Sequence, residues 1–311
     1  TALRQRAAGS GPLMTPVPIT GQARRAGRLV ALLSLCVYLT TAGGSLTSTD
    51  AVMTYELTRS LVLRRSVAVR YNVIDLDAHR GVDGRFYSPF GIGQSVFDVP
   101  FFVAGHLART RLGLNIGRSD SLEKAAVALS RAVAAAGLVW VVFLFAWRLS
   151  GQLHGAVWTA LAVGFSTLIW PYSKFGFNAP LTAWCVLAGV QAAWVGVRTD
   201  RRSLIGWSGV WLGCAFLTRH EMALAAAGIA AWILFESAGR WSRAREHLTW
   251  FAAPLGAAGL LWVWYNLIRF GSAFSTGYAG DPGYMPHGPL EGIYGLLLSP
   301  GRSLFLYVPL A

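Results

Sequence analysis

The chain has 311 residues, of which 54% are hydrophobic and only 13% are charged, and its mean hydropathy is +0.46. This composition is typical of a protein with several membrane-spanning helices and argues against an ordinary soluble domain. The net charge of +13 would suggest a nucleic-acid ligand in a soluble protein, but here the basic residues fall mostly between apolar runs, so no nucleic-acid partner is expected. The three cysteines lie in different apolar runs with no paired spacing, which supports neither a disulfide framework nor a metal site.

The first segment, residues 1–26, is rich in Gly, Pro and Ala and is predicted to be a disordered cytoplasmic N-terminus. Residues 27–311 are predicted to form one all-α domain, a polytopic bundle of transmembrane helices. Because a spanning helix needs about 20 apolar residues, the candidate spans are 28–44, 127–147, 155–172, 179–197, 204–217, 222–235, 248–268 and 293–310. The short runs 204–217 and 222–235 are interpreted either as separate spans or as one bent pair. The chain begins with Thr and the last run reaches residue 311, so we expect a fragment that lacks C-terminal helices.

The arginines indicate which loops face the cytoplasm. They precede the first span and recur in alternate later loops, at Arg24, Arg25, Arg28, Arg148, Arg198, Arg201, Arg202, Arg240, Arg243 and Arg245. All of them lie inside together if residues 91–107 do not cross the bilayer, and outside if they do. We prefer the first alternative, because Asp98, Pro100 and several glycines interrupt that stretch. Residues 45–124 then form a long extracytoplasmic first loop with helices near the membrane surface, since loops beyond about 60 residues translocate largely regardless of charge.

This topology collects polar residues at the outer face. They are Asp50, Glu56, Asp75, Asp77, Asp83, Lys174, Asn178, Arg219, His220, Glu221 and the loop 269–291. Ionisable groups within the membrane cost about 2.5 to 3.5 kcal/mol unless they face a cavity or a partner. We therefore expect a polar cavity there, although a snorkelling side chain or an interfacial anchor explains any single one of these residues equally well.

Short motifs recur along the chain in a characteristic order. The residues Thr49 and Asp50 precede Tyr55 and Glu56, and the later motifs are DGRFYSPFGIG at 83–93, WPYSK at 170–174, NAPL at 178–181, LTRHE at 217–221, RFGS at 269–272, TGY at 276–278 and LSPGR at 298–302. In this order they resemble the bacterial GT-C glycosyltransferases, which include the dolichyl-phosphate-mannose protein mannosyltransferase-like enzymes and the aminoarabinose transferase of lipid A. The resemblance covers nearly the whole chain from residue 28 onward.

The resemblance implies a glycosyltransferase of the bacterial inner membrane with its active site on the extracytoplasmic face. The donor would be a polyprenyl-phosphate-linked sugar, and the acceptor a glycan, a lipid or a protein. Nucleotide sugars stay in the cytoplasm, so a site on the outer face must take a donor delivered through the membrane lipid. The alternative is a polytopic transporter or lipid flippase, a class that often shows two halves with matching hydropathy. We find no second copy of the acidic loop or of any motif.

Asp50 is the predicted catalytic base. A carboxylate near an apolar boundary has a raised pKa, which suits it to accept a proton from an acceptor hydroxyl, and the resemblance gives this role to the acid after the first helix. The alternative is that Asp50 is a helix N-cap. Many relatives have a second acid directly after the first, whereas this chain has Ala51. A paired-acid mechanism is therefore not supported; no metal ligands are predicted, and a divalent cation is left open.

The departing lipid phosphate needs a cation, and four residues are candidates: Lys174, Arg219, Arg131 and Arg269. Arginine binds phosphate through two donors at once. Lys174 ranks first because the chain has only one other lysine, although a snorkelling anchor explains it equally well. Arg219 has the alternative of a local ion pair with Glu221. The remaining predicted substrate-binding residues are Glu56, Asp83, Tyr87, Asn178 and Tyr278.

Overall fold

The computed structural model describes residues 15–70, 79–114, 120–237, 239–277, 288–301 and 303. Helices dominate these residues, as the all-α prediction requires. They are α2 (Gly21–Thr40), α3 (Thr49–Arg64), α4 (Ile92–Arg111), α5 (Ser121–Ser150), α6 (Leu153–Phe165), α7 (Ile169–Tyr172), α8 (Ala179–Thr199), α9 (Arg202–Thr218), the 3-10 helix η2 (His220–Met222), α10 (Ala223–Glu236), α11 (Trp241–Phe270) and α12 (Pro289–Leu297). The short strands β1 (Ala68–Val69) and β2 (Phe86–Tyr87) pair antiparallel.

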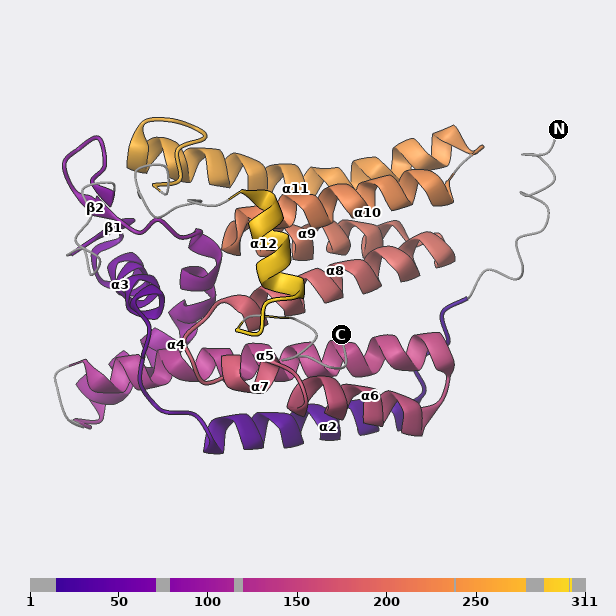
Figure 1. Cartoon of the computed structure of the whole chain (residues 1–311), viewed down its shortest axis with the longest axis horizontal. Helices are drawn as coiled ribbons and strands as arrows, with labels where there is room; N and C mark the ends of the chain where they lie inside the picture. Colours follow the sequence, from indigo (N-terminus) through magenta and orange to yellow (C-terminus); the bar gives the residue numbers. More distant parts are fainter. Residues whose placement is uncertain are drawn as a thin grey trace.

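Seven of the helices lie side by side along the long axis of the molecule and form a bundle, with α2, α5 and α6 on one side and α8, α9, α10 and α11 on the other (Figure 1). Within the part of the chain that the structure describes, α5, α8 and α11 are long and apolar enough to cross a membrane. These helices fit the membrane protein that the composition predicts.

Glycines bring α9 close to both of its main neighbours. A side chain at Gly189 of α8 would collide with Leu212, and one at Gly209 of α9 would collide with the backbone of Phe251 in α11. Small residues allow such close approach of helix backbones. The middle of α9 is therefore packed closely between α8 and α11.

The runs 204–217 and 222–235 form two helices, α9 and α10, that meet at residues 219–222 and turn back on each other. Ile205 of α9 and Ile233 of α10 share one apolar cluster, and Glu236 at the end of α10 pairs with Arg198 at the end of α8. The turn between the two helices consists of Arg219 and η2. The predicted span 155–172 is divided into two helices, α6 and α7.

The first helix, α2, begins at Gly21, earlier than the predicted boundary at residue 27, because the hydroxyl of Thr20 caps it.

The arginine clusters gather at one end of the bundle, which we call the arginine-rich end. Arg202 pairs with Glu246 and Arg243 with Asp200, which joins the loops on both sides of α9 and α10. The start of the described chain reaches the same region as Arg148 at the end of α5, because the amide of Val17 donates to the carbonyl of Arg148. The loops that the sequence assigned to one side of a membrane thus lie together.

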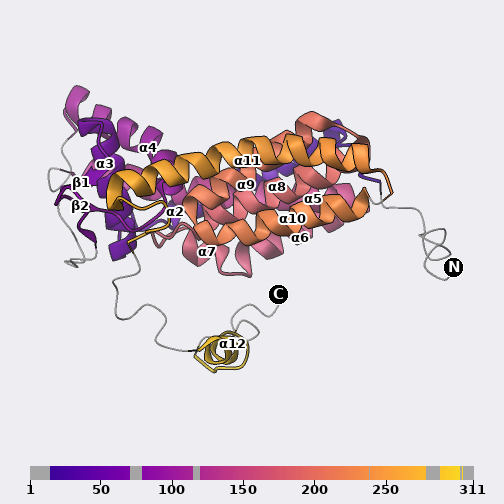
Figure 2. The same cartoon turned by 90° about the horizontal axis from the view of Figure 1, so that it is seen from above.

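The opposite end carries α3, α4 and the two strands (Figures 1 and 2), and we call it the site end. Residues 92–107 of the stretch 91–107 fall in α4, and Gly91 is the N-cap of that helix. A side chain at Gly105 would meet Leu122, Glu123 and Ala126 near the start of α5, and the other end of α4 lies against the end of α9. This helix therefore packs across the site end and does not follow the length of the bundle.

Candidate functional site

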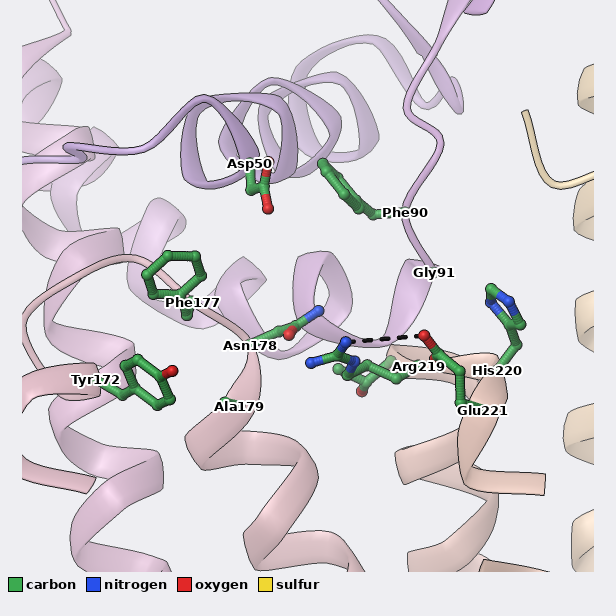
Figure 3. Close-up of a pocket in the computed structure, with 11 residues that line it drawn as sticks. Asp50, Phe90, Gly91, Tyr172, Phe177, Asn178, Ala179, Arg219, His220 and Glu221 are labelled. Carbon is green, nitrogen blue, oxygen red and sulfur yellow. Dashed lines mark ion pairs between the residues drawn. The ribbon is translucent and has the colours of Figure 1, made fainter. Parts of the chain in front are cut away.

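A polar cavity of about 300 Å³ opens at the site end (Figure 3). Four segments that are far apart in the sequence contribute to it: the start of α3, the loop before α4, the segment from α7 to the start of α8, and the turn between α9 and α10. Its lining residues are Asp50, Phe90, Gly91, Tyr172, Phe177, Asn178, Ala179, Thr218, Arg219, His220 and Glu221. The cavity thus brings together five of the polar residues that the sequence placed at the outer face, Asp50, Asn178, Arg219, His220 and Glu221. Three of these, Asp50, Asn178 and Arg219, are predicted site residues.

Asp50 lies in the first turn of α3 and faces the cavity (Figure 3). The helix is capped by Ser48, whose hydroxyl accepts a hydrogen bond from the amide of Ala51 at 3.2 Å. The alternative that Asp50 itself is the N-cap is therefore wrong, and its carboxylate is left to the cavity. Burial raises the pKa of the Asp50 carboxyl above its ordinary value, and the positive charge of Arg219 opposes this rise. Asp50 is thus a better proton acceptor than an ordinary surface aspartate.

Arg219 approaches the cavity from the break between α9 and η2. Its backbone is extended, with φ −143° and ψ 113°, so α9 ends and the side chain turns toward the cavity. The guanidinium lies 3.7 Å from the Glu221 carboxylate, and both side chains are nearly half exposed. Such a pair contributes at most about 1 kcal/mol. An anionic ligand is therefore able to replace Glu221 on the guanidinium, which offers paired donors to phosphate.

The remaining walls are aromatic and amide groups. Phe90, Tyr172 and Phe177 line the cavity, and the rings of Tyr172 and Phe177 lie 5.4 Å apart. Asn178 contributes its side-chain amide from the start of α8. Gly91 lies so close to the carbonyls of Leu217 and Thr218 that no side chain fits there. The cavity therefore combines aromatic faces with a mainly polar lining.

Two predicted binding residues, Lys174 and Glu56, do not line the cavity. The ammonium of Lys174 sits over the Trp170 ring at 5.0 Å from its centroid, a cation–π contact of the kind that fits an interfacial anchor. Glu56 is buried in α3 and lies 3.6 Å from Arg59. The prediction that these two bind substrate stays untested.

Asp83 and Tyr87 hold the turn before β2 and also lie outside the cavity lining. The Tyr87 hydroxyl donates to Asp83 at 2.8 Å, and the Arg85 amide donates to the same carboxylate at 3.0 Å. Burial, followed by the bond to Asp83, raises the pKa of Tyr87 to about 12, so it remains a donor. Tyr278, the last predicted binding residue, lies outside the described residues.

Two arginines proposed for the leaving phosphate are buried in structural contacts. Arg131 donates to the Asp98 carboxylate at 2.7 Å, and its side chain is 1% exposed. Arg269 stacks on the Tyr265 ring at 3.6 Å and donates to the Asn266 side chain at 2.6 Å. Neither side chain lines the cavity, because Arg131 joins α5 to α4 and Arg269 joins α11 to the carbonyl of Ser88 in the loop before α4. The structure therefore does not support either of them as a phosphate-binding group.

Phe177 lines the cavity, although it belongs to none of the sequence motifs. It directly precedes the predicted site residue Asn178, and that adjacency is the one signal that pointed to it. Thr218 also lines the cavity and falls in the LTRHE motif, but no role was predicted for it. As for metals, no three histidine, cysteine, aspartate or glutamate side chains in the described ranges lie close enough to hold an ion.

Comparison with known proteins leaves the geometry of the site as the main evidence on function. No family model, no curated protein and no solved structure matches the chain. The resemblance to GT-C glycosyltransferases therefore depends on the order of the sequence motifs.

Proposed function

We propose that the chain is an integral membrane glycosyltransferase that moves a sugar from a polyprenyl-phosphate donor to an extracytoplasmic acceptor. The observation that carries this proposal is the cavity that Asp50 and Arg219 share. A carboxylate with a raised pKa suits the activation of an acceptor hydroxyl. A guanidinium with a weak exposed partner suits a lipid phosphate.

The position of the cavity supports the same function. Because arginine-rich loops favour the cytoplasmic side, the arginine-rich end faces the cytoplasm and the site end faces outward from a bacterial inner membrane. The helices α2, α6, α9 and α10 then lie within the bilayer beside α5, α8 and α11, while α3 and α4 lie at its outer surface. A donor anchored in the outer leaflet reaches the cavity with its phosphate at headgroup depth.

In the proposed reaction, Asp50 accepts the proton of the acceptor hydroxyl as the hydroxyl oxygen forms its bond to the anomeric carbon. The bond between that carbon and the phosphate oxygen breaks, and its electron pair leaves with the lipid phosphate. Arg219 stabilises the negative charge on this leaving group. The amide of Asn178 is available to hold a sugar hydroxyl, and the aromatic walls offer apolar faces to the sugar ring.

The alternative of a transporter or lipid flippase needs a polar path through the bundle. Beneath the cavity, however, Ala134, Leu181, Cys185 and Ala215 pack into one apolar cluster. These apolar side chains offer no polar path there, which favours chemistry at the membrane surface over passage.

The experiment uses purified protein in liposomes with a radiolabelled polyprenyl-phosphate sugar and an envelope extract as acceptor. Asp50→Asn is expected to lower transfer by about 10²- to 10⁴-fold, while labelled donor still binds. Glu246→Gln, an exchange at the arginine-rich end, serves as the control and is expected to retain activity. Transfer at the unaltered rate by Asp50→Asn would refute the proposal. Mass spectrometry of the labelled product then identifies sugar and acceptor.

A further inference from the structure

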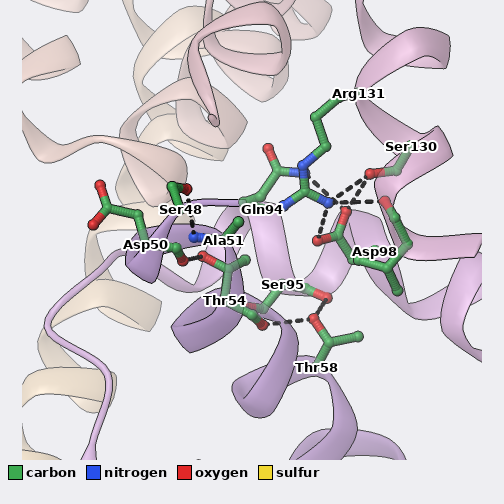
Figure 4. Close-up of polar contacts among 11 residues, drawn as sticks. Ser48, Asp50, Ala51, Thr54, Thr58, Gln94, Ser95, Asp98, Ser130 and Arg131 are labelled. Atoms are coloured by element: carbon green, nitrogen blue, oxygen red, sulfur yellow. Dashed lines mark hydrogen bonds and ion pairs between the residues drawn. The ribbon is translucent and has the colours of Figure 1, made fainter. Parts of the chain in front are cut away.

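The helix that carries Asp50 is fastened to α4 by buried hydroxyl groups (Figure 4). Ser95 of α4 donates to the carbonyl of Thr54 at 3.0 Å, and Thr58 donates to the carbonyl of Ser95 at 3.2 Å. Thr54 in turn donates to the carbonyl of Asp50 at 2.8 Å. These hydrogen bonds connect α4 directly to the backbone of the residue that faces the cavity.

One turn further along α4, a buried charge fastens this helix to α5. The Asp98 carboxylate accepts hydrogen bonds from Arg131 at 2.7 Å, from Ser130 at 2.6 Å and from Gln94 at 2.8 Å. Asp98 is fully buried. A buried ion pair contributes little to stability relative to apolar packing, but its directional bonds permit one arrangement of the two helices.

The same helix also touches the segment that carries Arg219. A side chain at Gly93 of α4 would come within 3.0 Å of Thr218, the residue directly before Arg219. Through this contact and the bonds of Ser95, α4 is in contact with both segments that supply charged groups to the cavity. The separation of Asp50 from Arg219 thus depends on where α4 lies.

We infer that Ser95 and Asp98 are positioning residues that set the place of the Asp50 carboxylate relative to Arg219. The inference rests on the proposed function for the role of Asp50. Apolar contacts between α3 and α4, such as those of Met53 and Leu57 in their cluster with Ile92, resist separation of the helices. They are not directional, so the hydroxyl bonds are what prevent α3 from sliding or rotating on α4, while the ion pair holds α4 in place on α5.

The first test removes one hydroxyl group. Ser95→Ala is expected to lower the turnover number by at least about tenfold with little change in donor affinity. It is also expected to shift the acid limb of the pH–rate profile, because the pKa of Asp50 depends on its distance from Arg219. Ser208→Ala is the matched control, since Ser208 is equally buried but its hydroxyl has no hydrogen-bond partner in the described part of the chain. Thr58→Ser keeps its hydroxyl and is expected to retain the original profile, whereas Thr58→Val is not. A Ser95→Ala protein with an unchanged rate and pH profile would overturn the inference.

The second test does not depend on activity. Spin labels at Thr49→Cys and Leu224→Cys, in a protein freed of its other cysteines, report the distance between the start of α3 and the start of α10. We expect a narrow distance distribution in the labelled protein without further substitution. Ser95→Ala and Asp98→Asn are expected to shift or broaden this distribution, and Ser208→Ala is expected to leave it unchanged. Distributions that are identical in all of these proteins would contradict the positioning role. Absence of sugar transfer by the unaltered protein would instead refute the proposed function. The distance measurement would still show whether Ser95 and Asp98 fix the position of α3.

Discussion

At Gly176, the addition of a single methyl group is expected to disturb the cavity. It lies in the segment between α7 and α8, and a Cβ atom built on it would come within 3.0 Å of the Cβ of Ala51 in α3. The backbone of Gly176 is not left-handed, so alanine is conformationally acceptable there. Any effect of Gly176→Ala therefore comes from the collision with Ala51.

The size of the effect follows from this geometry. Carbon atoms in contact lie about 3.5 to 4.0 Å apart, so the loop and α3 must separate by on the order of 1 Å. Overpacking of this kind costs about 1 to 3 kcal/mol of stability. The loop carries Phe177 and Asn178 and the helix carries Asp50, so the shift falls on the site itself. A misplacement of about 1 Å lowers the rate by about 10²-fold.

The assay is sugar transfer together with thermal unfolding in detergent. Gly228→Ala is the control, because a Cβ atom at Gly228 meets nothing within 4 Å and alanine favours its helix. Ala51→Gly removes the atom that Gly176→Ala strikes, so the double variant is expected to recover most of the rate, at a cost of up to about 1 kcal/mol for glycine in the helix. Normal transfer by Gly176→Ala, or no recovery in the double variant, would refute the reasoning.

Further expectations concern the charged groups. Arg219→Gln is expected to weaken donor binding, measured by titration with the labelled lipid; retained affinity would count against its phosphate role. The same change removes the charge that lowers the pKa of Asp50. Because Asp50 accepts a proton only when it is ionised, the acid limb of the plot of kcat/KM against pH is expected to move to higher pH. An unmoved limb would argue against Asp50 as the base. Asp98→Asn leaves the Arg131 charge buried without its carboxylate and is expected to destabilise the protein by about 3 to 5 kcal/mol. The double variant Asp98→Leu with Arg131→Met removes both charges and is expected to unfold at nearly the same temperature as the unaltered protein. Equal losses in the single and double variants would contradict the ion-pair account.

Features that depend on local sequence were predictable. Long apolar runs give helices because a helix satisfies its own backbone hydrogen bonds, and the alternation of arginine-rich loops anticipated their meeting at one end of the bundle. Asp50, Asn178 and Arg219 were identified because each lies at a helix terminus at the same end. The capping role of Ser48 was not assigned, because Ser48, Thr49 and Asp50 are all suitable caps in sequence.

Features that depend on distant partners were not predictable. The role of Arg269 is decided by the carbonyl of Ser88, which lies 181 residues earlier in the chain. The role of Arg131 is decided by Asp98, 33 residues earlier, on a helix whose direction the sequence did not reveal. An arginine near a helix end therefore looks the same in sequence whether it binds a ligand or fastens two helices.

The central claim is that the cavity with Asp50 faces outward from the cell, and labelling of single cysteines tests it most directly. Ser45→Cys reports on the site end and Ser242→Cys on the arginine-rich end, each in a protein whose native cysteines Cys36, Cys185 and Cys214 are replaced. A membrane-impermeant maleimide added to spheroplasts, which have lost their outer membrane, is predicted to label position 45 at once and position 242 only after the inner membrane is opened. Labelling of position 242 but not of position 45 in intact spheroplasts would contradict the account.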